Sequence, residues 1–193
     1  MSFLLNPGVL SVLRRCAKGA GALLIGALAV GCGGGAKQIE PFVPKRVVAF
    51  GDENSVILAD GRKYTVNSVV DGRIDCTTNV IWVQKLANSL GIPLRECPLP
   101  AAAGATALAA TSFSRAAASA TVDDVRVQID NHLATDTLGE KDLVTIYVGL
   151  HNILQGYERL ATSDEATITA SLQAQGKTLG EQVNRVAQTG APV

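Results

Sequence analysis

The residues best placed to do chemistry follow an apolar run at positions 47–50. The run leads into Gly51, Asp52 and Glu53, and Ser55 lies two positions further on. A glycine after a buried strand favours a tight turn, and α/β proteins place their sites beyond the carboxyl ends of strands. A glutamate can transfer a proton, and a serine hydroxyl can act as a nucleophile. The sequence therefore predicts Glu53 and Ser55 as candidate catalytic residues, with Asp52 beside them.

Two later segments offer further candidates. Gly104 lies in the Ala-, Ser- and Thr-rich stretch 101–120, where small side chains would let backbone approach a reacting centre. The same composition also fits a solvent-facing loop without a role. His151 and Asn152 follow the apolar run 143–148. His151 can donate a hydrogen bond, act as a base or form an ion pair with Glu53, and it can equally be an ordinary polar partner.

The elements that must position these residues alternate along the chain. Residues 45–50 and 143–148 read as strands buried on both faces, and residues 95–100 as the strand between them. Helices are expected from Thr77 or Thr78 to residue 90, from Thr121 to residue 133, from Ser163 onward, and after Thr178, which forms a capping box with residue 181. Asp60-Gly61 predicts a hairpin or a surface flap. The alternation predicts an α/β domain with a parallel sheet.

The blocks around Glu53, Gly104 and His151, in that order, resemble the SGNH (GDSL) family of esterases and lipases. The resemblance covers about residues 45–193. It implies a three-layer, flavodoxin-like (SGNH hydrolase) parallel sheet with flanking helices, the last strands missing. It also implies acyl-ester hydrolysis as the family activity. In that family a serine stands at the position of Glu53, and Gly104 and His151 fall on the oxyanion-hole positions, His151 in place of an asparagine. Asn152 falls on the aspartate that follows.

The resemblance also implies altered chemistry. A glutamate cannot form the serine ester, and the family's C-terminal Asp-x-x-His base is absent. Loss of such a group typically lowers the rate by about 10⁶. Three functions follow as expectations. The protein is a weak or inactive relative of the ester hydrolases, a non-catalytic envelope module that binds acyl or glycan ligands, or an active hydrolase that uses Ser55 or an unusual arrangement of Glu53 and His151.

The first 31 residues predict a secretory signal, with basic residues, an apolar run and then small residues before Cys32. The pattern resembles a bacterial lipobox, which implies a lipid on Cys32 and attachment to the membrane. The alternatives are an ordinary cleaved signal and an uncleaved anchor. Residues 32–44 predict a flexible tether. In a Gram-negative host the residue after the lipid-bearing cysteine helps to sort lipoproteins, and aspartate there usually retains them at the inner membrane. Gly33 therefore favours the outer membrane in such a host, facing the periplasm or the cell surface.

Cys76 and Cys97 predict a disulfide, since an even pair in an exported chain is typically bridged. Two free buried thiols are the alternative. The chain has 17 basic and 17 acidic residues, and loss of the basic leader leaves a net charge of about −3. No basic patch for nucleic acid is present, and no phosphate-binding loop, dinucleotide fingerprint or zinc spacing predicts a cofactor or metal.

The sequence ends at residues 190–193, where a next strand is expected to begin. With the flavodoxin-like strand order two, one, three that the resemblance implies, the third strand becomes an open edge. A truncated gene, a fragment, or a protein partner that covers this edge would each account for it.

Overall fold

The computed structural model describes residues 40–193, which include a compact unit from Val43 to Val193. The predicted signal, Cys32 and most of the tether lie outside the described residues. Within residues 40–193, none of the helices combines the length and the apolar character that crossing a membrane requires.

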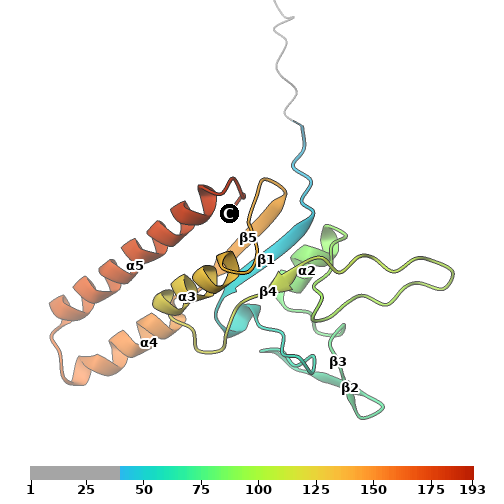
Figure 1. The fold of residues 1–193 in the computed structure, drawn as a ribbon. Coiled ribbons are helices and arrows are strands. Elements are labelled where there is room, and N and C mark those ends of the chain that lie inside the picture. Colours follow the sequence, from blue (N-terminus) through green and yellow to red (C-terminus); the bar gives the residue numbers. More distant parts are fainter. Residues whose placement is uncertain (1–39) are drawn as a thin grey trace, which may run out of the picture. The chain divides into compact units, whose positions relative to one another are not determined.

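Three parallel strands form the main sheet (Figure 1). They are β1 (Arg46–Gly51), β4 (Phe113–Ser114) and β5 (Asp142–Tyr147), in the order β4-β1-β5. The first and third predicted strands are therefore confirmed, and the chain order two, one, three is observed. The predicted strand at 95–100 is wrong. Two prolines in that stretch lack the N–H that a ladder needs, and β4 instead follows the loop that begins there.

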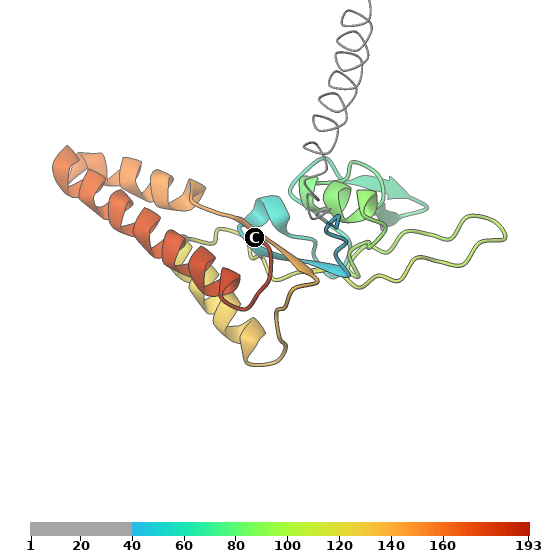
Figure 2. The ribbon, with the colours of Figure 1, turned by 90° about the horizontal axis from the view of Figure 1, so that it is seen from above.

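Helices cover both faces of this sheet because β1 is apolar on both sides. Val47 and Ala49 pack on α2 (Trp82–Ser89). On the opposite face, Val48 and Phe50 pack in a core with α3 (Val122–Leu133) and α5 (Glu165–Ala187). Figures 1 and 2 show α2 on one side of the sheet and α3 and α5 on the other. The α/β fold, with a parallel sheet flanked by helices, is confirmed at this level.

Several helix boundaries differ from the predictions. Helix α2 begins at Trp82, since the hydroxyls of Thr77 and Thr78 bond to the Asp75 carboxylate and do not cap a helix. Helix α4 (Leu150–Glu158) and the short η2 (Arg159–Ala161) occupy a stretch where no helix was expected. Thr178 lies inside α5, which is a single helix capped by Asp164. The prediction of a separate last helix is therefore wrong. The cap of α3 by Thr121 is confirmed.

A second, two-stranded sheet follows β1. Strands β2 (Ser68–Val70) and β3 (Arg73–Asp75) pair across a turn at Asp71 and Gly72, both with positive φ. The hairpin predicted around Asp60-Gly61 is reduced to one bridge between Ile57 and Lys63. Asp-Gly occurs in both turns, so a turn at Asp60-Gly61 was correctly predicted, but the extended strand pairing expected beside it does not form.

The outer edge of β5 is only partly covered. The Val144 N–H donates to the Pro192 carbonyl at 2.8 Å, so the C-terminal residues lie beside β5. Tyr147, at the end of the strand, is 51% exposed.

Candidate functional site

The turn after β1 depends on Gly51. Its φ is +137°, and an added Cβ would lie 1.9 Å from the Tyr147 carbonyl oxygen, so only glycine fits. The side chain of Gln128, from α3, accepts from the Gly51 N–H at 2.8 Å and donates to its carbonyl at 2.9 Å. Gln128 was not predicted, because a glutamine on a helix carries no sequence signal for such a contact. Gln128 thus holds the turn against α3.

Asp52 acts as the cap of the short helix η1 (Glu53–Ser55). It is fully buried, and its Oδ1 accepts from the backbone and side-chain nitrogens of Asn54 at 3.0 and 2.8 Å. Ser55 is also fully buried, and its Oγ has no hydrogen-bond partner. A hydroxyl without a base beside it is not activated as a nucleophile. The structure therefore gives Ser55 a packing position.

Glu53 meets two groups from distant parts of the chain. His151, in the first turn of α4, places its Nε2 2.9 Å from both carboxylate oxygens of Glu53. The backbone N–H of Ser119 donates to Glu53 Oε2 at 2.9 Å. The structure thus brings the predicted pair of Glu53 and His151 into contact and adds a donor that the sequence did not indicate.

The Glu53 carboxyl is ionised at neutral pH. Burial raises its pKa, but the backbone N–H groups of Glu53 and Ser119 and the side chain of His151 lower it, and the net pKa lies below the ordinary value. The Glu53 carboxylate thus places a negative charge between the Ser119 N–H and the His151 imidazole.

Gly104 does not reach this arrangement. It precedes β4, and an added Cβ there would meet no atom within 4 Å. Figures 1 and 2 show the yellow-green loop that contains it reaching away from the sheet. The place beyond the carboxyl end of β4 belongs to residues 115–120, which include Ser119. Gly104 was expected just beyond the second strand of the sheet. That strand, β4, begins after Gly104, so Gly104 does not lie at its carboxyl end.

Asn152 lies beside His151 but performs a different task. Its Oδ1 accepts from the Val122 N–H at 3.0 Å and so joins α4 to the first turn of α3. This bond fixes the start of α4, and with it the position of His151.

A small cavity of about 160 Å³ adjoins Glu53. It is lined mainly by apolar groups of Glu53, Val56, Leu58, Arg62, Lys63, Tyr64 and Ala118. The Arg62 guanidinium is engaged by Asp60 at 2.6 Å. The cavity therefore offers a mainly apolar space with Glu53 among its lining residues.

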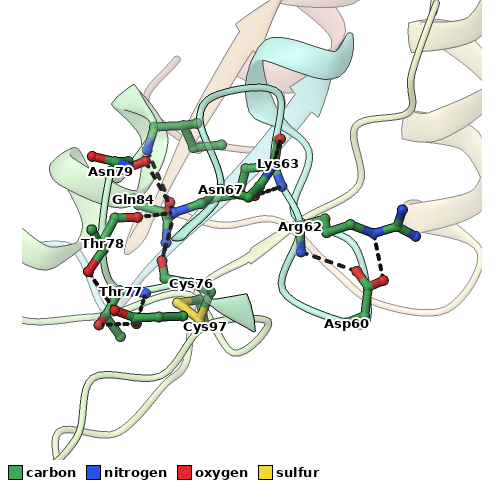
Figure 3. Close-up of a disulfide and its surroundings, with 12 residues drawn as sticks. Asp60, Arg62, Lys63, Asn67, Cys76, Thr77, Thr78, Asn79, Gln84 and Cys97 are labelled. Carbon is green, nitrogen blue, oxygen red and sulfur yellow. Dashed lines mark hydrogen bonds and ion pairs between the residues drawn. A yellow bond between two sulfur atoms is a disulfide. The ribbon is translucent and has the colours of Figure 1, made fainter. Parts of the chain in front are cut away.

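Lys63 ties the wall of this cavity to the disulfide region (Figure 3). Its ammonium donates to the carbonyls of Cys76, Thr78 and Asn79 at 2.8, 2.7 and 3.2 Å. Burial lowers its pKa, against the opposing charge of Asp75. The structure contains the predicted disulfide between Cys76 and Cys97, which anchors the segment that carries the first of these carbonyls.

Within residues 40–193, no group of three or more His, Cys, Asp or Glu side chains could hold a metal ion. No protein-family model matches the chain, and no curated protein matches it either.

Proposed function

We propose that the protein is a non-hydrolysing relative of the SGNH ester hydrolases that binds a small acyl-type ligand in the cell envelope. The sequence blocks around Glu53 and His151 support the family, and the sheet order β4-β1-β5 agrees with a flavodoxin-like arrangement. The lipid on Cys32 and the outer-membrane location are part of this proposal and rest on the leader pattern alone.

One observation carries the proposal. The Glu53 carboxylate lies against the Ser119 N–H and the His151 imidazole, each at 2.9 Å. An ester hydrolase needs such donors free for the oxygen of a tetrahedral intermediate. Here they already bind a negative charge, and the position holds no hydroxyl. An ester carbonyl entering this site would meet an occupied oxyanion position and no nucleophile.

The cavity beside Glu53 supports an acyl-type ligand. Its walls are mainly apolar and its volume is about 160 Å³, similar to a cavity that holds benzene. A short acyl chain or a small aryl group fits this space, whereas a glycan would leave most of its hydroxyls unpaired. Acyl ligands are therefore favoured over glycans at this site.

The first test is turnover of p-nitrophenyl acetate by the full chain. We expect no hydrolysis above background. Turnover that is lost in Ser55→Ala would instead establish an active hydrolase that uses Ser55. Turnover lost in Glu53→Gln but kept in Ser55→Ala would establish an unorthodox glutamate–histidine mechanism.

The second test uses Glu53→Ala, with Glu181→Ala, an exposed glutamate on α5, as the matched control. Removal of the carboxylate frees the Ser119 N–H and His151. We expect Glu53→Ala to bind acetate, measured by shifts of the Ser119 amide resonance, and expect the wild type and Glu181→Ala not to bind it. Equal acetate binding by all three proteins would show that these donors do not form an anion site.

A further inference from the structure

One face of α4 is apolar and open to solvent. The helix runs beside α5 in Figures 1 and 2. Residues spaced three and four positions apart share a face of a helix, and the large apolar side chains of α4 and η2 follow this spacing. Each is between 43% and 73% exposed, and they are Leu150, Ile153, Leu154, Tyr157 and Leu160. We call these five residues the α4 face.

A groove of about 200 Å³ extends the α4 face toward α5. Its walls are almost wholly apolar and come from both helices and η2, with Ile153, Gly156, Tyr157, Leu160, Ile168 and Leu172 as the lining residues. An apolar side chain of a partner can therefore enter between the two helices.

The α4 face has the size of an interaction surface. The exposed area of its five side chains is on the order of 500 Å², and an apolar patch of this size on a monomer is often functional. Two such faces in contact, with part of their polar rims, would bury about 1,200 Å², which is the lower limit for a specific interface. The area therefore suffices for a weak dimer.

The charges near the face favour a second copy of this chain over a lipid surface. Helices that lie on membranes carry Lys and Arg on their polar side, whereas α4 contains neither, and the first basic residue after it is Arg159 of η2. Helix α4 begins at Gly149 without a side-chain cap and without an acidic residue in its first turn.

Glu158, at the other end of α4, supplies the charge that this helix N-terminus lacks. It is exposed, and among residues 40–193 no cation lies within ion-pair distance of it. A negative charge is stabilised at a helix N-terminus. An antiparallel copy of α4 would bring one Glu158 to each uncapped N-terminus, so the two ends of the face are complementary in charge.

We propose that the α4 face joins two copies of this chain in a symmetric dimer. A two-fold axis near Ile153 and Leu154 places Leu150 of each copy against Tyr157 of the other. A two-fold interface requires a surface that is complementary to itself. The α4 face meets this requirement because its five side chains are uncharged, so its centre brings no like charges together.

The dimer face is separate from the acyl site. None of its five residues lines the cavity beside Glu53. His151, on the same helix, contacts Glu53 and is not part of the face. Loss of dimerisation and loss of acyl binding are therefore distinguishable.

Sedimentation velocity of the full chain at about 1–500 µM tests the dimer. We expect a monomer–dimer equilibrium with a dissociation constant of about 10–100 µM, because an interface of this size is weak. Leu154→Asp places two carboxylates near the two-fold axis and should weaken dimerisation at least tenfold. Leu108→Asp, at an exposed position in the loop before β4, is the matched control and should leave dimerisation unchanged.

A second pair of variants tests the antiparallel arrangement. Glu158→Lys places a positive charge at the N-terminus of the facing helix and should weaken dimerisation at least threefold. Glu181→Lys, at an exposed position on α5, should have no effect. An unchanged circular dichroism spectrum shows that each variant is folded.

Several results would overturn the proposed dimer. They are a monomer at every concentration, a dimer that Leu154→Asp leaves intact, and equal effects of Glu158→Lys and Glu181→Lys. Binding to phosphatidylglycerol vesicles that is lost in Leu154→Asp and kept in Leu108→Asp would also overturn it, because the face would then belong to a lipid surface.

Discussion

Replacement of Lys63 by methionine tests how the wall of the cavity beside Glu53 is held. The Lys63 ammonium binds three backbone carbonyls, and the residue is only 6% exposed. Methionine preserves most of the apolar stem and removes all three hydrogen bonds. The segment from Cys76 to Asn79 then loses its three hydrogen bonds to Lys63 (Figure 3), and the bond from Asn79 Nδ2 to the Val66 carbonyl at 2.9 Å remains.

The expected loss of stability depends on whether the three carbonyl oxygens find other hydrogen-bond donors. The Cys76 oxygen keeps a second donor, the Gln84 amide at 3.1 Å. The oxygens of Thr78 and Asn79 lose the partner they have, and an unsatisfied buried group costs about 1–3 kcal/mol. Both residues are exposed, so water can replace part of the loss. We therefore expect a loss of about 2 kcal/mol, which corresponds to a fall of roughly 4–8 °C in Tm for a domain of this size.

Urea unfolding followed by circular dichroism measures this change. Lys85→Met, at an exposed position on α2, is the matched control and should change the free energy of unfolding by less than about 0.5 kcal/mol. An effect of Lys63→Met as small as that of the control would refute the reasoning, because it would show that the three contacts contribute no net stability.

Three further perturbations have defined outcomes. Burial lowers the pKa of His132, so the unfolded chain binds a proton at this histidine more readily than the folded chain does. The stability gained from neutral His132 should be fully present above about pH 6.5 and should fall below that pH. His132→Leu should flatten this pH dependence of the urea midpoint. Gly51→Ala would place a Cβ 1.9 Å from a backbone carbonyl of β5 and should cost more than about 4 kcal/mol or abolish soluble expression, whereas Gly139→Ala, with no atom within 4 Å, should be tolerated. Joint replacement of Cys76 and Cys97 by serine should lower the free energy of unfolding by about 3 kcal/mol. Reductant should not destabilise this double variant further, and an equally large loss of stability on adding reductant to it would contradict the assignment of the effect to the disulfide.

The parts of the fold that sequence predicted are those set by local patterns. Residues of β1 are apolar on both faces, so the burial of this strand followed from composition, and the alternation of strands and helices predicted its parallel pairing with β5. Thr121 begins α3 because its hydroxyl and the Asp124 carboxylate bond to each other's backbone. The errors have local causes as well. Strand β4 has only two residues, too few to show a period, and Thr178 resembles a cap although α5 continues through it.

The sequence alone determined the Gly51 turn and the cysteine pair, because each depends on neighbouring residue types or on a simple count, whereas the expected strand order came from the family resemblance. It also singled out Glu53 and His151 as candidates. Only the tertiary structure decided that these two side chains meet, 98 residues apart, and that the Ser119 N–H joins them in place of Gly104. Such contacts depend on where β4 begins and on how α4 is held against α3. Packing between distant segments fixes both, and no local pattern encodes it.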